Sequence, residues 1–252
     1  MAKKIAVFAA LKEELAGLKG ELKIAERHRQ GKILAGSLRG REMVLAETGI
    51  GMEKAGETAR FVFGEFDIDF ALSIGFAGGV QPRLRSGDLV MADRILFADG
   101  ETGFSEGRPR PAQEIKPPPA KIEDIGRRLS GMGIPYRRGG ILTVTRAVES
   151  IQQKKWIGEN YPVEAVEMET FAIAQEAEKK SISLGALRTI SDTVEDALVD
   201  VSALVDENGE ISKFKAGLYV ISHPGALPKF LSLRENSKKA AKVLAGAVFA
   251  VI

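Results

Sequence analysis

Short apolar runs alternate with segments of helical periodicity along this chain, and this alternation constrains the fold more than any other feature. Residues 5–9 and 70–74 are apolar runs of strand length, whereas residues 53–66 place Ala55 and Ala59 on one side of a helix. Strands that alternate with helices are typical of α/β folds. The sequence therefore predicts a three-layer α/β/α sandwich around a central mixed, largely parallel sheet.

The length of the chain favours one folding unit. It has 252 residues, of which 44% are hydrophobic, enough to bury one sizeable core. We find no internal repeat and no linker-like stretch in the sequence. Because α/β folds of this length often form one domain, we expect a single domain over residues 1–252.

Hydrophobic periodicity predicts the other elements. We expect a hairpin from 32–37 and 42–48, strands at 88–92 and 140–144, and helices over 12–18, 121–130, 147–159, 169–179 and 231–250. The Gly- and Pro-rich residues 98–119 predict an irregular segment, which is either a lid or a passive surface loop.

The residue content excludes several kinds of chemistry. There is no cysteine, which excludes disulfides, thiolate catalysis and Cys-ligated metals. The two histidines, His28 and His223, lie far apart in sequence, and His223 is in a turn-like Ser-His-Pro-Gly stretch. We therefore expect no Ser-His-Asp triad and no His-based metal site. The sequence as a whole implies no metal or organic cofactor.

The charge pattern argues against nucleic acid and membranes as partners. The net charge is +2, and basic residues come in scattered pairs that we interpret as solvent-exposed, such as Arg137-Arg138, Lys154-Lys155 and Lys238-Lys239. No stretch approaches the roughly 18 apolar residues that a membrane span requires. These features predict a cytoplasmic protein with no membrane insertion.

Acidic side chains stand at the ends of several predicted strands. Glu167 and Glu169 end one apolar run, and Asp192 follows the run 184–190. Glu14 comes shortly after the first strand. Because ligands of open α/β sheets bind beyond the carboxyl ends of the strands, this placement predicts acid/base chemistry on a small polar substrate.

Two glycine-rich segments are candidates for ligand-binding loops. The segment 75–79 follows a buried strand, and we interpret it as a ligand-facing turn, with a plain tight turn as the alternative. The segment 49–51 lacks the third glycine of a dinucleotide fingerprint, since Lys54 stands there. The chain also has no phosphate loop, so NAD binding is not expected.

Six motifs occur in one order along residues 5–195: Ala-Ala-Leu-Lys-Glu-Glu-Leu from 9, Thr-Gly-Ile-Gly from 48, Gly-Phe-Ala-Gly-Gly from 75, Gly-Asp-Leu-Val from 87, Val-Glu-Met-Glu from 166 and Arg-Thr-Ile-Ser-Asp from 188. Together they resemble the purine nucleoside phosphorylase superfamily, specifically its methylthioadenosine/adenosylhomocysteine nucleosidases. Residues 221–228 and the helix after them are similar to the hopanoid-associated members, which are thought to remove adenine from adenosylhopane.

The resemblance implies roles for individual residues. Asp192 would be the general acid that protonates purine N7, and Glu14 would position and deprotonate the attacking water. Glu169 would bind the ribose hydroxyls, with Met168 packing on the sugar. The remaining residues expected to bind substrate are Glu167, Phe76, Ala77, Gly78, Ser191 and Val148.

The chain departs from the resemblance at three informative positions. Phe76 stands where the nucleosidases have a small hydroxyl residue, and Val148 lies near the position of their purine-stacking aromatic. These two residues favour a bulkier, more apolar 5′ substituent. Ser73 stands where phosphorylases have an arginine for phosphate, which together with the charge of Glu14 favours hydrolysis over phosphorolysis.

These observations predict a nucleosidase that cleaves the N-glycosidic bond of a 5′-substituted adenosine with water and releases adenine. The substrate would be methylthioadenosine/adenosylhomocysteine-like or adenosylhopane-like. The alternatives are a phosphate-dependent nucleoside phosphorylase, a futalosine-type hydrolase and a non-catalytic nucleoside-binding protein. The resemblance also implies a homo-oligomer, with a dimer expected first.

Overall fold

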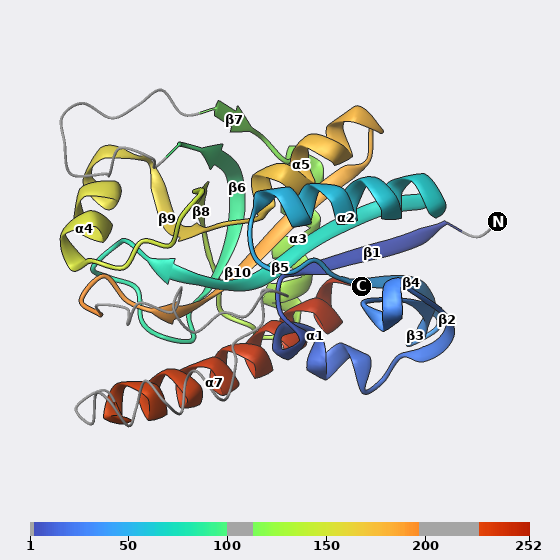
Figure 1. Cartoon of the computed structure of the whole chain (residues 1–252), viewed down its shortest axis with the longest axis horizontal. Helices are drawn as coiled ribbons and strands as arrows, with labels where there is room; N and C mark the ends of the chain where they lie inside the picture. Colours follow the sequence, from blue (N-terminus) through green and yellow to red (C-terminus); the bar gives the residue numbers. More distant parts are fainter. Residues whose placement is uncertain (1–2, 100–112, 197–226) are drawn as a thin grey trace.

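The computed structural model describes residues 3–99, 113–196 and 227–252 (Figure 1). Its first half contains β1 (Lys4–Ala9), α1 (Lys12–Lys19), β2 (Lys23–His28), the 3-10 turn η1 (Arg29–Gly31), β3 (Ile33–Leu38), β4 (Arg41–Glu47), α2 (Met52–Glu65), β5 (Ile68–Gly79) and β6 (Leu89–Phe97). The second half contains β7 (Gln113–Ile115), α3 (Pro119–Gly131), β8 (Arg137–Thr143), α4 (Ile151–Asn160), β9 (Val163–Glu167), α5 (Thr170–Lys179), β10 (Ser183–Asp192) and α7 (Leu227–Val251).

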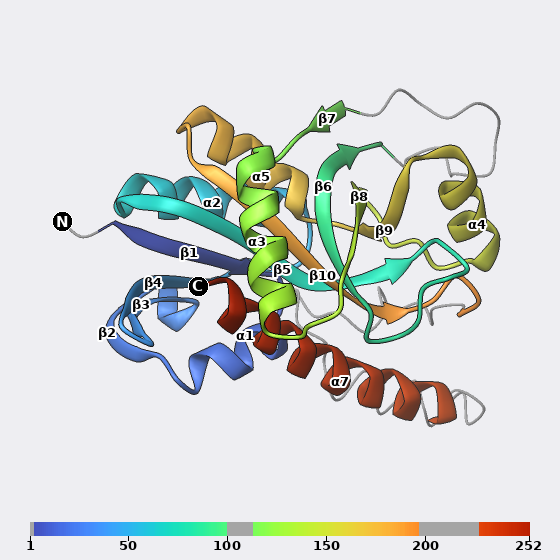
Figure 2. The same ribbon diagram turned by 180° about the vertical axis from the view of Figure 1, so that it is seen from behind.

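All the described strands belong to one mixed sheet with the order β10-β6-β8-β9-β5-β1-β4-β3-β2, with β7 paired to β6. Strands β4, β1, β5 and β10 run parallel to one another through its middle. An additional pairing of β10 with β5 closes the strands β5, β10, β6, β8 and β9 into a ring. The long strand β5 therefore belongs both to the open sheet and to this ring (Figure 2).

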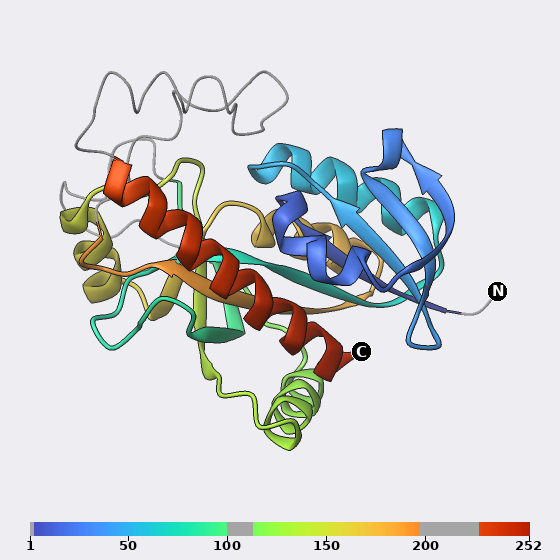
Figure 3. The same cartoon turned by 90° about the horizontal axis from the view of Figure 1, so that it is seen from below.

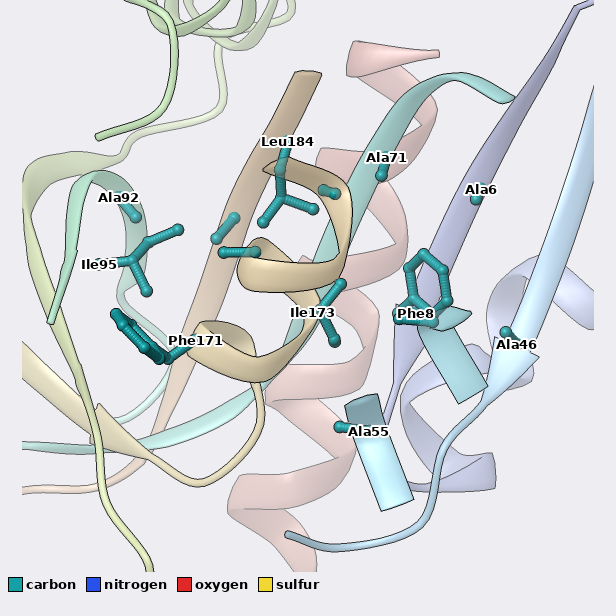
Figure 4. Close-up of a cluster of buried hydrophobic side chains, with 14 of the residues drawn as sticks. Ala6, Phe8, Ala46, Ala55, Ala71, Ala92, Ile95, Phe171, Ile173 and Leu184 are labelled. Carbon is teal, nitrogen blue, oxygen red and sulfur yellow. The ribbon is translucent and has the colours of Figure 1, made fainter. Parts of the chain in front are cut away.

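Helices cover both faces of the sheet, which confirms the predicted three-layer α/β fold. Helices α2 and α5 lie on one face, where Ala55 and Ile173 belong to the same apolar cluster as Phe8 and Ala71 of the strands (Figure 4). Helices α1, α3 and α7 lie on the other face, and Leu18, Ile125 and Val248 contribute to a second apolar cluster there (Figure 3). The two layers bury the period-2 apolar positions of the central strands.

The glycine-rich segment 75–79 is not the turn that we predicted. It continues β5, because its main chain pairs on one side with β10, where Ala77 is opposite Ile190, and on the other with β9, where Gly78 is opposite Val166. Partners on both sides keep this segment extended despite its glycine content.

Three other expectations need correction. The helix expected over 147–159 begins at Ile151, because the Ser150 side chain accepts a 3.1 Å hydrogen bond from the Gln153 main chain and caps the helix there. The segment 98–119 contains the short strand β7, and β2 was not anticipated. Lys154 is fully buried, although we had interpreted it as solvent-exposed.

Other predictions fall partly outside the described residues. Residues 100–112 of the segment expected to be either a lid or a passive surface loop lie there, as does the turn around His223. In the described part of the chain, no helix is long and apolar enough to cross a membrane. The assignment of residues 1–252 to one domain stays a prediction.

Candidate active site

Glu14 lies in the first turn of α1, directly after β1, and is 3% exposed. Its Oε2 accepts a 2.8 Å hydrogen bond from the Leu11 main chain, and its Oε1 accepts one of 2.7 Å from the main-chain N–H of Phe76 in β5. Burial raises the pKa of Glu14 to about 7, although these backbone donors oppose the shift. Its carboxyl group can therefore gain or lose a proton near neutral pH.

Glu169 lies between β9 and α5 and is also buried. Its Oε1 accepts a 2.8 Å hydrogen bond from the main-chain N–H of Gly51, in the turn that leads into α2. Burial and the negative charge of Glu167 raise its pKa to about 8, and Glu14 adds to this shift. The carboxyl groups of Glu14 and Glu169 are thus close enough to influence each other's protonation.

Glu167 has a different environment from Glu169. It is paired with the buried Arg188, at 2.7 Å, and accepts further hydrogen bonds from Thr143, from the Glu169 main chain and from Thr170. Burial opposes ionisation, but the charge of Arg188 and these donors outweigh it and hold the pKa of Glu167 below its usual value. With both oxygens engaged by the protein, Glu167 is better suited to fixing the end of β9 than to binding a substrate.

Asp192 ends β10 and is 5% exposed. Its Oδ1 accepts a 2.6 Å hydrogen bond from the Ser191 hydroxyl. Its Oδ2 accepts a hydrogen bond from the ammonium group of Lys154, a side chain of α4 that was not among the residues predicted for the site. Lys154 is the main addition that the structure makes to the candidate site.

Two glycines of β5 provide the space that these acidic side chains occupy. A Cβ atom on Gly75 would lie 2.9 Å from Oε1 of Glu14, and one on Gly78 would lie 3.1 Å from Oδ2 of Asp192. At about 3.3 Å per strand residue, the two glycines are about 10 Å apart along β5. The last residues of β5 therefore separate Glu14 from Asp192 along one strand.

Apolar side chains lie near these carboxyl groups. Phe76 is half-buried and belongs to neither large apolar cluster. Val148 is buried in a third cluster with Val166, and the half-buried Met168 packs against it. The expected sugar-packing residue and the apolar residue expected near the purine therefore belong to one apolar wall.

The remaining expected substrate-binding residues lie beside Asp192. The Ala77 carbonyl is 3.3 Å from the Ser191 hydroxyl, and Gly78 is partly exposed next to both. The arrangement offers carboxyl groups of different proton affinity beside a partly exposed apolar surface. Such a combination can support proton transfer at two points of a polar substrate. Among the described residues, no group of three or more His, Asp or Glu side chains is placed to hold a metal ion.

The sequence pattern of the Phosphorylase superfamily matches residues 4–219, which is most of the chain. The chain belongs to the Phosphorylase superfamily. This agrees with the resemblance of the six motifs, all of which lie in the matched range.

Individual proteins are similar to this chain in sequence or in fold. The 5′-methylthioadenosine/S-adenosylhomocysteine nucleosidase of Staphylococcus aureus (strain bovine RF122 / ET3-1) is 28% identical over 200 residues, covering 75% of this chain and 86% of that protein. A crystal structure of the same kind of nucleosidase from Neisseria meningitidis, in complex with methylthio-immucillin-A, superposes with a TM-score of 0.75 at 24% identity, covering 99% of this chain and 98% of that one. Futalosine hydrolase of Helicobacter pylori strain 26695 gives a TM-score of 0.74 at 19% identity, covering 99% and 97%. These two solved structures share the fold of this chain.

Proposed function

We propose that the protein is an N-glycosyl hydrolase that cleaves a 5′-substituted adenosine with water and releases adenine. The observation that carries the proposal is the placement of Glu14 and Asp192 at two points of the same strand end, at Gly75 and Gly78. Hydrolysis of a glycosidic bond needs an acid at the leaving group and a base at the water, on different sides of the reacting carbon. The activity named for the Staphylococcus aureus relative supports this choice within the superfamily.

Asp192 takes the role of general acid. As the bond between C1′ and N9 breaks, its electron pair moves into the purine. The Asp192 carboxyl group would donate a proton to N7 and so neutralise the negative charge of the leaving purine. The hydrogen bond from Ser191 to Oδ1 supports this role because it fixes the carboxyl plane.

Glu14 takes the role of general base for the attacking water. Each of its oxygens accepts one main-chain donor, which leaves lone pairs free to accept a hydrogen bond from water. A pKa of about 7 suits a base that must take a proton near neutral pH.

Glu169 and Met168 take the roles of sugar-binding residues. Glu169 is held by the main chain of Gly51 and Met168, so its orientation is fixed before any ligand arrives. The apolar cluster that includes Val148 supports a site for the apolar parts of the nucleoside.

Water is favoured over phosphate as the nucleophile. Ser73 is fully buried, and its hydroxyl accepts a 2.9 Å hydrogen bond from Arg188 and lies 3.2 Å from the Thr170 hydroxyl. It is therefore not free to bind an anion. Glu14 would in addition repel phosphate when ionised.

The proposal is tested by incubating the protein with methylthioadenosine, adenosylhomocysteine and a long-alkyl 5′ analogue in phosphate-free buffer. We expect free adenine and a free sugar, measured by chromatography and mass spectrometry. Strict dependence on phosphate with a sugar 1-phosphate product would identify a phosphorylase. Cleavage of futalosine alone would identify a futalosine-type hydrolase, and binding without cleavage a nucleoside-binding protein.

We extend the proposal to assembly, location and substrate group. A homodimer is proposed on the resemblance to the nucleosidases, and light scattering of the purified protein tests it. The cytoplasmic location also stays a prediction. So does membership of the hopanoid-associated group, which is tested by whether the protein prefers a substrate with a bulky apolar 5′ group.

A further inference from the structure

Lys154 is a buried cation that the mechanism above does not use. Its side chain is 0% exposed, although it projects from the same turn of α4 as the half-exposed Lys155. Its ammonium group contacts Oδ2 of Asp192, the Thr193 carbonyl at 2.9 Å and the Asp196 carbonyl at 2.7 Å. An ammonium group has three donors, so all of them are engaged.

The surroundings of this ion pair are closely fitted to it. A Cβ atom on Gly78 would lie 3.1 Å from Oδ2 of Asp192 and 3.7 Å from Cε of Lys154, so the glycine leaves room for both partners. The other oxygen of Asp192, Oδ1, accepts a hydrogen bond from the Ser191 hydroxyl. Three segments of the chain, β5, β10 and α4, therefore meet around one carboxyl group.

Other charged groups nearby are engaged elsewhere. The Asp196 carboxylate accepts two 2.8 Å hydrogen bonds from Thr193, one from its main chain and one from its hydroxyl. Lys155 pairs at 3.1 Å with Glu195 on the surface. In the part of the chain that the structure describes, Lys154 is thus the charged group in direct contact with Asp192.

We propose that Lys154 is a positioning residue of the proposed reaction, which fixes the Asp192 carboxyl group and stabilises the carboxylate left after its proton passes to the purine. A neighbouring positive charge makes a carboxyl group a stronger acid. When the proton moves from Asp192 to N7, negative charge develops on Asp192 beside Lys154, so the attraction is stronger after the transfer than before it. Lys154 thereby acts through Asp192, without touching the substrate.

The proposal rests on the proposed function, and it is tested with Lys154→Gln and Lys154→Met. The glutamine variant retains hydrogen-bond donors but no charge, whereas the methionine variant loses both. Lys155→Gln is the matched control. It removes a cation from the same helical turn, and that cation also contacts the 193–196 segment, through Glu195.

The first measurement does not depend on turnover. In protein labelled with ¹³C at the Asp carboxyl carbons, the Asp192 signal is assigned by its loss in Asp192→Asn and followed against pH. We expect its titration to move to higher pH by about one unit or more in Lys154→Gln and to stay unchanged in Lys155→Gln. An unchanged titration in Lys154→Gln overturns the proposal, as does an equal shift in the control.

The second measurement is adenine release against pH. We expect kcat to fall about 100-fold in Lys154→Met, with a smaller change in KM, and one limb of the pH profile of kcat/KM to move to higher pH in Lys154→Gln. A fall in kcat with both limbs unmoved indicates a merely structural lysine and overturns the proposal. If the wild-type protein releases no adenine, the proposed function fails, and the carboxyl titration alone decides whether Lys154 controls the proton of Asp192.

Discussion

The main-chain N–H of Phe76 donates a 2.7 Å hydrogen bond to Oε1 of Glu14, 62 residues earlier in the chain. The donor belongs to the backbone of β5, so the position of the proposed base does not depend on which side chain stands at residue 76. The half-buried Phe76 side chain is therefore free to influence which substrate is accepted.

Because the main chain of Phe76 holds Glu14 and its side chain does not, the side chain leads to a prediction about substrate size. We expect the wild-type protein to prefer an adenosine with a bulky apolar 5′ group over methylthioadenosine, and Phe76→Ser to reduce that preference. An additional ~60 Å² of buried apolar surface at about 25 cal/mol per Å² corresponds to roughly tenfold in kcat/KM. Steady-state competition between the two nucleosides measures it, and an equal or better kcat/KM for methylthioadenosine in the wild type contradicts it.

Asp192→Asn should retain the fold and lower turnover by about 100-fold or more, the usual contribution of a positioned proton donor. The asparagine side-chain oxygen can still accept a hydrogen bond from Lys154. The fall in turnover would therefore arise from the loss of the acidic proton rather than from the loss of this contact. Glu195→Gln is the control, because that side chain is exposed and only three residues beyond the end of β10. Near-normal turnover in a folded Asp192→Asn protein would remove Asp192 from its role.

Glu14 links activity to the pH dependence of stability. Its pKa is raised to about 7 in the folded protein, so the folded state holds this proton more tightly than the unfolded state does. The resulting stability is complete below the carboxyl group's ordinary range near pH 4.5 and is lost as the pH rises to about 7, a change on the order of 3 kcal/mol. Glu14→Gln should therefore make the free energy of unfolding fall less steeply between pH 5 and pH 8.

Urea unfolding at pH 5, 6, 7 and 8 measures this slope. The exposed neighbour Glu13 provides the matched control, and Glu13→Gln should keep the wild-type slope. Identical slopes for Glu14→Gln and the wild type would mean that Glu14 is not the group that titrates. The same variant should also lose adenine release, since its side chain cannot accept a proton from water.

Gly75→Ala separates the geometry of the site from the stability of the fold. The new Cβ atom would lie 2.9 Å from Oε1 of Glu14, so the carboxyl group has to move away from the Phe76 N–H. Since a misplaced base costs about 100-fold in rate, activity should fall by that order while the melting temperature changes little. Gly64→Ala, in open space on α2, should keep full activity. A fully active Gly75→Ala protein would show that the close fit between β5 and Glu14 is not needed.

The carboxyl groups of the candidate site could be predicted to lie near strand ends from the sequence, because each follows a strand with a strong apolar pattern. Lys154 could not, because a Lys-Lys pair is typical of a solvent-exposed surface. One signal was available: Lys154 lies three residues after Ile151 and three before Ile157, a spacing that places it on the buried side of α4.

The remaining errors concern segments whose structure depends on distant partners. The glycines after residue 74 are typical of a turn, and only pairing with β9 and β10 makes them part of β5. Strand β2 is an edge strand that is exposed or partly exposed along its whole length, so it has no apolar pattern to reveal it. Local sequence carries little information in both cases.

Glu169 receives its hydrogen bond from Gly51, which precedes it by 118 residues, and Asp192 receives one from Lys154, which precedes it by 38 residues. Contacts of such long sequence separation form late, because the intervening chain must first give up its freedom. During refolding, local helices such as α2 can form well before the carboxyl groups come together. The return of catalysis, rather than the return of helix content, therefore marks completion of the native state.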